Sequence, residues 1–312
     1  MSGEIFAVNL YIAGLYTTGY SQQENTSFYR NAAPNSRALR CGVAHHLESY
    51  HYIHKGRYCE LIRADKVKVF LDSGAFSAFS LGATIHLEEY AEFIKEHQDM
   101  IEMASVLDAI GDPVGTYHNQ NKLESMGAEV LPCFHYGEPL DLCEYYVKNY
   151  PYMTIGGMVP IPNNKLEVWL DEVWDKVLTD KDGYARGRVH GFGLTARKLM
   201  LKYPWYSVDS SSWVQAGANG SIILPEISQA ISISERSPSA RDFSRHYATF
   251  PAMARRRVDE LLTYYGTSAE EVSTDYRARW SLNAYAYHRL GVILGDDHWR
   301  KPFKARQKGL FD

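Results

Sequence analysis

The sequence predicts an α/β fold: a TIM-type (β/α)8 barrel with insertions and a helical, basic C-terminal extension. Three observations predict it. Short apolar runs recur along the chain, helical patterns separate several of them, and polar residues follow the runs directly. Strands that alternate with helices in this way are typical of a parallel sheet that closes into a barrel. An open, doubly wound parallel sheet is the alternative fold.

The predicted strands share one form, an apolar run with Gly, Asp, His or Pro close behind it. Short apolar runs bounded by turn residues are typical of buried parallel strands. The carboxyl ends of barrel strands form the active-site face, so the polar residues behind the runs are the candidate site. In chain order the runs cover residues 5–12, 67–71, 103–107, 129–134, 152–155, 188–189, 206–208 and 221–224.

The predicted helices place apolar residues at helical spacing on one face. Residues 14–63 form a long connection, which we expect to contain helical pieces around 43–63. Residues 225–247 are polar and are predicted as an extended loop. The helical patterns cover residues 87–98, 165–178, 252–265 and 269–289.

The charge distribution divides the chain into a predicted barrel, residues 1–235, and a helical extension, residues 236–312, packed on it. The 312 residues carry 33 Lys and Arg against 37 Asp and Glu, a net charge of −4, which argues mildly against a polyanion-binding protein. The extension holds 14 basic and 9 acidic residues, a net of +5, which leaves 19 and 28, a net of −9, for the barrel.

Basic residues of the extension are candidates for binding nucleic-acid phosphates. A solvated helix face is the alternative interpretation of the same charges. The candidates are Arg255, Arg256, Arg257, Lys301 and Lys304.

Four cysteines in 312 residues are too few for a disulfide scaffold, and they form no CxxC pair, which excludes a thioredoxin motif and a standard zinc ribbon. A reducing cytoplasm is the expected compartment, the host cytoplasm if a phage encodes the chain. No signal peptide, transmembrane helix, GxGxxG motif or P-loop is apparent, so we expect no membrane partner and no nucleotide cofactor. One Cys/His group matches no established zinc spacing and has a polar helix as its alternative: Cys41, His45, His46, His51, His54 and Cys59. We therefore expect no metal.

Carboxylates that follow predicted strands are the main candidates for chemistry. Asp72 and Asp209 each come after an apolar run and before small residues, which let a ligand approach the backbone. Two carboxylates at one barrel mouth can divide a glycosidic reaction between nucleophile and proton carrier. The alternative is that both cap helices. Asp108, after a third run, could read the amino donors of a base edge or cap its own loop.

Other polar or small residues end further predicted strands. Gly156 and Gly157 leave a flat backbone surface for a planar ligand, although such a pair is more often a turn. His135 and His190 follow two more runs, and we expect each to shape a pocket by hydrogen bonding rather than to catalyse.

Five strings in one order resemble a known family: LDSGAFS at 71–77, FHYGEP at 134–139, IGGMVP at 155–160, HGFGLT at 190–195 and YSVDSSSW at 206–213. Residues 72–76 are similar to the Asp-Ser-Gly-Gly-Phe motif of tRNA-guanine transglycosylases, with Ala75 in place of the second Gly. The set is most similar to the DNA-modifying branch of that superfamily, the DpdA-like 7-deazaguanine transglycosylases. The shared order covers about residues 70–210.

The resemblance implies a base exchange in which a flipped guanosine loses guanine and gains a 7-deazaguanine, most simply 7-cyano-7-deazaguanine. Asp209 would attack the anomeric carbon, and Asp72 would carry the proton. The implied base-binding residues are Ser73, Phe76, Asp108, His135, Gly156, Gly157, Met158 and His190.

The sequence departs from the tRNA enzymes in two places. No cysteine lies beyond Cys143, so their CxCxxC zinc site near the C-terminus is absent. Residues 135–137 read His-Tyr-Gly where those enzymes carry a Gln-Gly segment. The missing zinc site favours DNA over tRNA as the polymer partner. The expected partners are DNA, with tRNA as the alternative polymer, and a free 7-deazaguanine base. The sequence leaves open whether helper proteins open the duplex.

Three alternatives to this function stay open. The chain could act on tRNA with the same chemistry, excise a base without replacing it, or be a non-catalytic barrel that binds nucleic acid. The presence of both Asp72 and Asp209 argues against the last of these.

Overall fold

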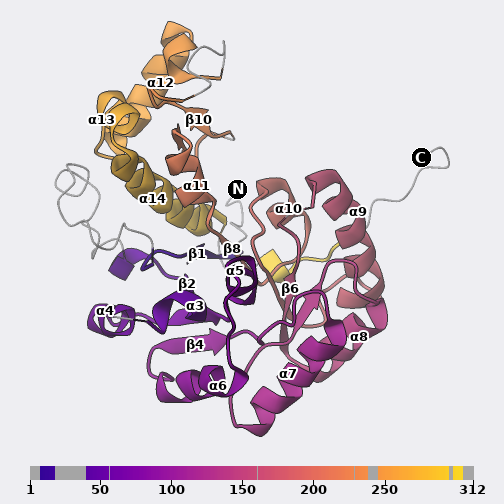
Figure 1. The fold of residues 1–312 in the computed structure, drawn as a ribbon. Coiled ribbons are helices and arrows are strands. Elements are labelled where there is room, and N and C mark those ends of the chain that lie inside the picture. The colour runs from indigo at the N-terminus through magenta and orange to yellow at the C-terminus, as the bar shows by residue number, and fades with distance from the viewer. Residues whose placement is uncertain are drawn as a thin grey trace.

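The computed structural model describes residues 8–17, 40–55, 57–159, 161–227, 229–237, 245–294 and 298–304. Eight parallel strands form one sheet in the order β4-β3-β2-β1-β8-β7-β6-β5, which curls through 251° and alternates with helices (Figure 1). The predicted α/β fold is thus confirmed, and the architecture is consistent with a (β/α)8-like barrel. The strands are β1 (Asn9–Ala13), β2 (His46–Ser49), β3 (Val69–Asp72), β4 (Ile101–Ala104), β5 (Cys133–His135), β6 (Tyr152–Gly156), β7 (Arg188–Gly191) and β8 (Ser207–Ser210).

The strand order is the cyclic order of a barrel that has been cut between β4 and β5. A parallel bridge between Ser105 and Leu131 spans the cut. The Leu131 amide donates to the Ala104 carbonyl at 2.8 Å, and the Val106 amide donates to the Leu131 carbonyl at 2.9 Å. We call this junction the β4–β5 seam. It is joined by residues that flank the two edge strands rather than by a ladder between them.

Helices surround the curved sheet, and two of them confirm the predicted amphipathic patterns at 87–98 and 165–178. They are α3 (Tyr50–Ile53), α4 (Tyr58–Asp65), α5 (Ala75–Ser80), α6 (Leu87–Glu96), α7 (Pro113–Ser125), α8 (Leu140–Asn149), α9 (Asn163–Val173), which continues as the π-helical turn η2 (Trp174–Leu178), and α10 (Arg197–Lys202).

The last predicted strand, residues 221–224, is wrong as a barrel strand. Its residues β9 (Ser221–Ile222) pair antiparallel with β10 (Ile231–Ser232) in a separate two-stranded sheet. The strand that completes the barrel is β2, which lies where helical pieces were expected. Helices α3 and α4 do occupy the rest of that stretch.

Strand β2 does not show an apolar run in the sequence, because the side chains on the face that points away from the cavity are polar. Leu47 and Ser49 line the cavity described below, whereas His46 and Glu48 alternate with them. His46 Nε2 lies 2.9 Å from the Arg40 carbonyl. Glu48 accepts the Tyr16 amide at 2.7 Å and is fully buried. On this face, these two side chains therefore bind main-chain atoms of neighbouring segments, whereas other strands place apolar side chains there.

Burial of Glu48 has a measurable consequence for stability. Burial raises the pKa of this carboxyl to about 8, against the hydrogen bonds from Tyr16 and Thr17 that favour the charged form. The unfolded chain ionises first, so stability falls as pH rises from about 4.5 towards 8. We expect Glu48→Gln to flatten this fall and to be more stable than the parent at pH 9 by about 2–4 kcal/mol in urea unfolding. Exposed Glu60→Gln is the control, and an unchanged slope in Glu48→Gln would contradict the assignment.

The C-terminal lobe comprises α11 (Ser212–Ala218), the two-stranded sheet, α12 (Ala252–Tyr264), α13 (Ala269–Thr274) and α14 (Tyr276–Leu294), at the upper left of Figure 1. Short 3-10 helices cover Tyr247–Thr249 and His298–Arg300. The predicted helix over 252–265 is confirmed. The one over 269–289 divides at Asp275, which is extended and whose carboxylate accepts the Arg277 amide at 2.8 Å.

Helix α14 joins the C-terminal lobe to the barrel, because it packs on both α11 and β1. Arg279 donates to the Gly217 carbonyl at 2.9 Å, and Trp280 Nε1 donates to the Val214 carbonyl at 2.9 Å. Asn283 bonds the carbonyls of Trp213 and Ser221. Among the residues that the structure describes, no helix is both long and apolar enough to cross a membrane.

Aromatic side chains fill the inside of the barrel below the cavity. Tyr11, Phe70, His190 and Phe192 contact one another edge-on or tilted, with ring centroids 4.6–5.8 Å apart. Such contacts suit the opposite charges of ring faces and edges. Among the described residues, this packing fills the barrel interior beneath the cavity, and Phe192 also lines the cavity itself.

Candidate active site

A cavity of about 950 Å³ opens at the carboxyl ends of the parallel strands. This is the face where the sequence analysis placed the site, and its volume suits a ligand of nucleotide size. Residues at or just beyond the end of every strand contribute to its wall. In strand order they include Gly14, Ser49, Asp72, Asp108, His135, Gly156, Phe192 and Asp209.

The cavity brings together most of the predicted catalytic and base-binding residues. Ser73, Met158 and His190 are buried and do not line it. Ser73 donates its amide to Ser105 Oγ at 3.1 Å, and Met158 packs in the hydrophobic core. These three therefore support the wall from behind. The predicted residues that line the cavity are Asp72, Phe76, Asp108, His135, Gly156, Gly157 and Asp209.

Asp209 lies in β8 and points into the cavity with a fixed orientation. Its Oδ1 accepts the Gly193 amide at 2.8 Å and lies 3.3 Å from His190 Nε2. The carboxylate is nearly buried, at 6% exposure. These two contacts hold one carboxylate oxygen, and the residue lines the cavity.

A chain of hydrogen bonds runs behind Asp209 across three neighbouring strands. His190 Nδ1 and Tyr152 OH each lie 2.6 Å from Ser207 Oγ. Burial lowers the pKa of His190, so its ring is neutral. Donation from Tyr152 to Ser207, from Ser207 to His190 Nδ1 and from His190 Nε2 to Asp209 then satisfies every group. The register that pairs His190 with Ser207 builds this chain from the sheet itself.

Asp72 ends β3 and titrates near neutrality. Burial raises its pKa to about 7, and repulsion from Asp108 and Asp209 adds to the shift. The Gly74 amide donates to its Oδ2 at 3.1 Å, which opposes the shift only in part. Asp72 is therefore both a proton donor and a proton acceptor at neutral pH.

The Asp-Ser-Gly-Ala-Phe string turns sharply from β3 into α5. Gly74 has a φ of 75°, and a Cβ there would lie 2.3 Å from Ser49 Oγ, so only glycine fits. The turn leaves Asp72 on the wall and places Phe76 at the mouth. The motif thus contributes a glycine that allows the turn as well as the carboxylate of Asp72.

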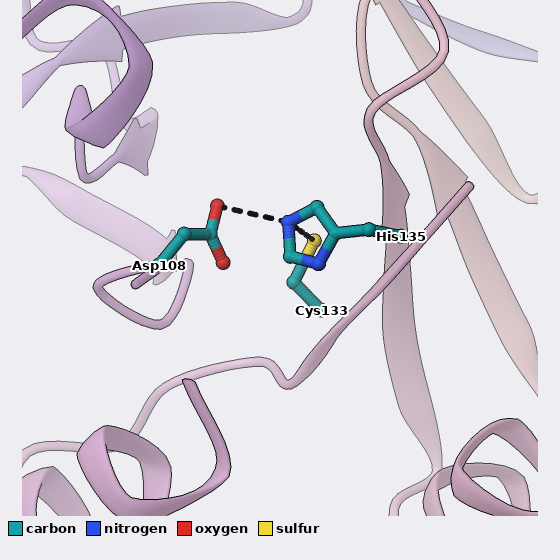
Figure 2. Close-up of side chains that lie close together, drawn as sticks. All are labelled: Asp108, Cys133 and His135. Carbon is teal, nitrogen blue, oxygen red and sulfur yellow. Dashed lines mark hydrogen bonds and ion pairs between the residues drawn. The ribbon is translucent and has the colours of Figure 1, made fainter. Parts of the chain in front are cut away.

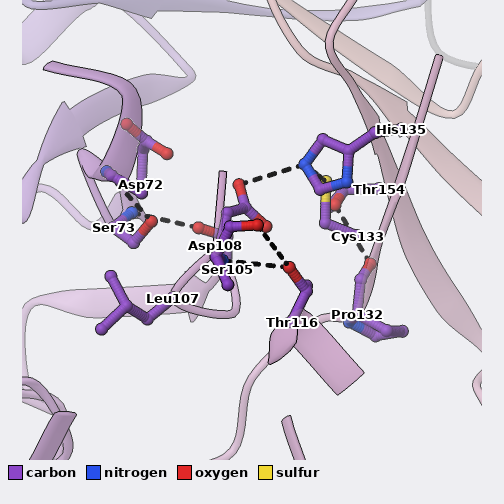
Figure 3. A network of polar contacts seen from close by, with 12 residues as sticks. Asp72, Ser73, Ser105, Leu107, Asp108, Thr116, Pro132, Cys133, His135 and Thr154 are labelled. Carbon is purple, nitrogen blue, oxygen red and sulfur yellow. Dashed lines mark hydrogen bonds and ion pairs between the residues drawn. The ribbon is translucent and has the colours of Figure 1, made fainter. Parts of the chain in front are cut away.

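Asp108, Cys133 and His135 form a second polar group at the β4–β5 seam (Figure 3). Asp108 Oδ2 lies 3.3 Å from His135 Nε2, while Asp108 Oδ1 is buried without a hydrogen-bond partner. His135 Nδ1 lies 3.1 Å from Glu138 Oε1. Burial opposes protonation of His135, but Cys133 and the hydrogen bonds to Asp108 and Glu138 outweigh it and raise its pKa. One Asp108 oxygen is therefore left that no group of the described chain uses.

The cavity mouth carries large apolar side chains that are exposed to solvent. Tyr52, Phe76 and Val159 are 44%, 67% and 73% exposed, and Ile110 completes the set. We call these four residues the apolar rim. Exposed apolar residues gathered around a cavity are typical of a binding surface.

The basic residues predicted to bind nucleic acid lie away from the cavity. Arg256 and Arg257 are exposed on α12 and pair with Glu260. Lys301 and Lys304 flank Phe303, whose amide donates to the Gly183 carbonyl ahead of β7. That position is at the amino ends of the strands, opposite the mouth. None of Arg255, Arg256, Arg257, Lys301 and Lys304 lines the cavity.

The Cys/His group considered around residues 41–59 does not converge in the structure. His54 Nδ1 and Cys59 Sγ contact carbonyls of their own segment, and Cys41 Sγ contacts the Asp65 carbonyl. Within the described ranges, the group of three potential metal ligands is instead Asp108, Cys133 and His135. Sequence reasoning missed Cys133, although its i, i+2 spacing from His135 in a strand places both on one face.

Sequence reasoning predicted His190 but missed the other residues that orient Asp209. Ser207 shares its strand face two residues earlier, a signal available in the sequence, whereas Tyr152 and Gly193 reach the site only through the fold. No protein-family model matches the chain, and no curated protein matches its sequence.

Proposed function

We propose that this protein is a base-exchange transglycosylase that replaces guanine in DNA with a 7-deazaguanine through a covalent Asp209 intermediate. One observation carries the proposal: two carboxylates at one cavity have different surroundings. Asp209 is fixed by two donors, whereas the pKa of Asp72 is raised to about 7 by burial and by neighbouring carboxylates. Carboxyl groups whose environments differ in this way divide nucleophilic and acid–base roles.

The exchange proceeds in two balanced steps. In the first, the free oxygen of Asp209 attacks C1′ of the nucleotide, and the glycosidic bond to guanine breaks. The bonding electrons leave with guanine, and Asp72 gives it a proton. In the second, Asp72 takes a proton from the incoming 7-deazaguanine, whose nitrogen attacks C1′ and releases Asp209. One glycosidic bond replaces another, so no energy source is consumed.

The cavity wall suits a purine that has been turned out of a helix. Gly156 and Gly157 leave a flat surface, because a Cβ at Gly156 would lie 3.0 Å from the His135 ring. Asp108 lines the cavity, and its carboxylate can accept hydrogen bonds from the donors on a guanine edge. Phe76 and Tyr52 of the apolar rim offer stacking partners for the flipped base or its neighbours. The choice of DNA over tRNA follows from the resemblance and from the absent CxCxxC motif.

The function is tested by mass spectrometry of nucleosides from cells that express the chain and supply 7-deazaguanine. A 7-deazaguanine deoxynucleoside in DNA is the expected product. If the modification is found in tRNA alone, the proposed reaction stands and the polymer substrate is tRNA instead of DNA. Abasic sites would identify an excising glycosidase, and no change in either polymer, with no covalent adduct in vitro, would leave a non-catalytic barrel.

The Gly193 amide gives a prediction about how Asp209 is held. Gly193 has a φ of 62°, and a Cβ there would lie 2.5 Å from Val159 Cγ2. We expect Gly193→Ala to cost about 1–2 kcal/mol of stability and to slow exchange about 10–100-fold by displacing Asp209.

Gly82 provides the matched control for that substitution. It has a φ of 66°, and a Cβ added there would meet no atom within 4 Å, so Gly82→Ala carries the backbone strain without a clash or a change at Asp209. Exchange rates and thermal unfolding of both variants make the comparison. A normal exchange rate in folded Gly193→Ala would show that this amide does not position the nucleophile.

A further inference from the structure

Three side chains of different chemistry converge at the β4–β5 seam (Figure 2). Asp108 follows β4, and Cys133 and His135 lie two residues apart on β5, so their side chains leave the strand on one face. One donor atom from each lies within 4.8 Å of the other two. A carboxylate, a thiol and an imidazole gathered in this way form a ligand set that zinc uses.

The distances within this group are also those expected between the ligands of one metal ion. His135 Nε2 lies 3.3 Å from Asp108 Oδ2 and 3.5 Å from Cys133 Sγ. A ring nitrogen carries at most one N–H, so Nε2 can donate to only one of these two neighbours, whereas a metal ion between the three atoms would bind all of them. Around a tetrahedral zinc ion, bond lengths of about 2.0–2.3 Å place such N···O pairs about 3.3 Å apart and N···S pairs about 3.6 Å apart. Both observed distances match those edges.

The surroundings of the three residues also match a metal site. His135 Nδ1 faces Glu138 Oε1 at 3.1 Å, and metal-bound histidines commonly donate their second ring nitrogen to a carboxylate. Glu138 Oε2 is itself fixed by the His135 amide at 2.9 Å. Cys133 is nearly fully buried, and Asp108 Oδ1 is buried without a partner. The imidazole is thus oriented, and a polar atom is left that hydrogen bonding within the described chain does not use.

We propose that Asp108, Cys133 and His135 bind one zinc ion, with the fourth coordination position open towards the cavity. A thiolate and a carboxylate together balance the charge of a divalent ion, and the mixed S, N and O set favours zinc over magnesium or calcium. Asp108 and His135 both line the cavity, so the open position takes water or a heteroatom of the bound ligand. This proposal replaces the expectation of no metal and does not depend on base exchange.

The position of the site gives the ion a structural effect as well. Asp108 belongs to the β4 side of the seam, and Cys133 and His135 belong to the β5 side. Apart from the Ser105–Leu131 bridge, the two edge strands lack a ladder. A metal ion held from both sides therefore ties the open edge of the sheet, and its binding raises the unfolding temperature.

The test measures metal binding by the full chain. Protein stripped with a chelator is titrated with zinc chloride and, separately, with cobalt chloride, and metal content is measured after desalting. We expect one equivalent per chain, a thiolate-to-cobalt charge-transfer band, and a higher melting temperature with zinc. Cys133→Ser should abolish the band, and both Cys133→Ser and Asp108→Asn should weaken zinc binding at least about 100-fold.

Cys41→Ser is the matched control, because Cys41 is exposed and lies outside the group. It should bind zinc like the parent. Circular dichroism without metal shows whether each variant is folded. If Cys133→Ser does not fold, Asp108→Asn, whose substitution lies on the cavity wall, becomes the test variant. The proposal is overturned if the parent binds less than one equivalent, or if folded Asp108→Asn binds as the parent does. The test measures metal content and spectra. Its outcome therefore does not depend on whether the protein exchanges bases.

Discussion

Asp209→Asn is expected to abolish the covalent adduct with guanine-containing DNA and to slow base exchange at least about 1,000-fold. The amide oxygen of Asn can still accept the Gly193 amide, so the local geometry is kept. Asn lacks the negative charge that attacks C1′, and its amide forms no stable ester-like intermediate. The adduct is measured on a denaturing gel after incubation with DNA in the absence of 7-deazaguanine, which stops the reaction after its first step.

Asp141→Asn is the matched control for this substitution. Asp141 is an exposed carboxylate in the first turn of α8 and does not line the cavity. It should form the adduct at the parent rate. An adduct in Asp209→Asn of unchanged yield would mean that another group is the nucleophile, and Asp72 would then be the first candidate.

The sequence predicted the barrel because several of its strands are largely continuous apolar runs. Strand β3, with three apolar residues before Asp72, shows such a run. Strand β2 could not be found in this way, since His46 and Glu48 use its outer face to bind main-chain atoms. Residues 221–224 are apolar for a different reason, because Ile222 and Leu224 pack in the core of the C-terminal lobe and its junction with the barrel. Periodicity reports burial, and burial alone does not say which sheet a strand joins.

The candidate site was predictable where one residue both ends a strand and points upward. Asp72 and Asp209 lie at the ends of β3 and β8, Asp108 lies in the segment after β4, and all three line the cavity. Ser73 and His190 are adjacent to such positions, yet their side chains lie below the wall. The hydrogen-bond chain through Ser207 and Tyr152 depends on the register of β6, β7 and β8, which no local pattern encodes. The sequence thus indicates which end of each strand is used, and the pairing of the strands determines the chemistry there.

Asp72→Asn is expected to slow exchange by about 100–10,000-fold and to remove the neutral pH optimum. In the parent, guanine departure needs protonated Asp72, so adduct formation falls as pH rises above about 7. Attack by 7-deazaguanine needs ionised Asp72, so release of the adduct falls as pH drops below about 7. Rapid-quench measurement of the two steps across pH separates these two pH dependences. Both pH dependences should be absent in the variant. If adduct formation and release in Asp72→Asn depend on pH as they do in the parent, another group transfers the proton.

The same substitution should affect stability in the opposite direction from activity. The folded-state pKa of Asp72 is raised from 3.8 to about 7, so the unfolded chain ionises first and the parent loses stability as pH rises between these values. Asn carries no such penalty and can still accept the Gly74 amide. We expect Asp72→Asn to be more stable than the parent at pH 8 by about 2–4 kcal/mol, and no more stable near pH 3. A variant that is inactive yet more stable cannot owe its inactivity to misfolding, and this combination is what a carboxylate held near neutrality for proton transfer requires.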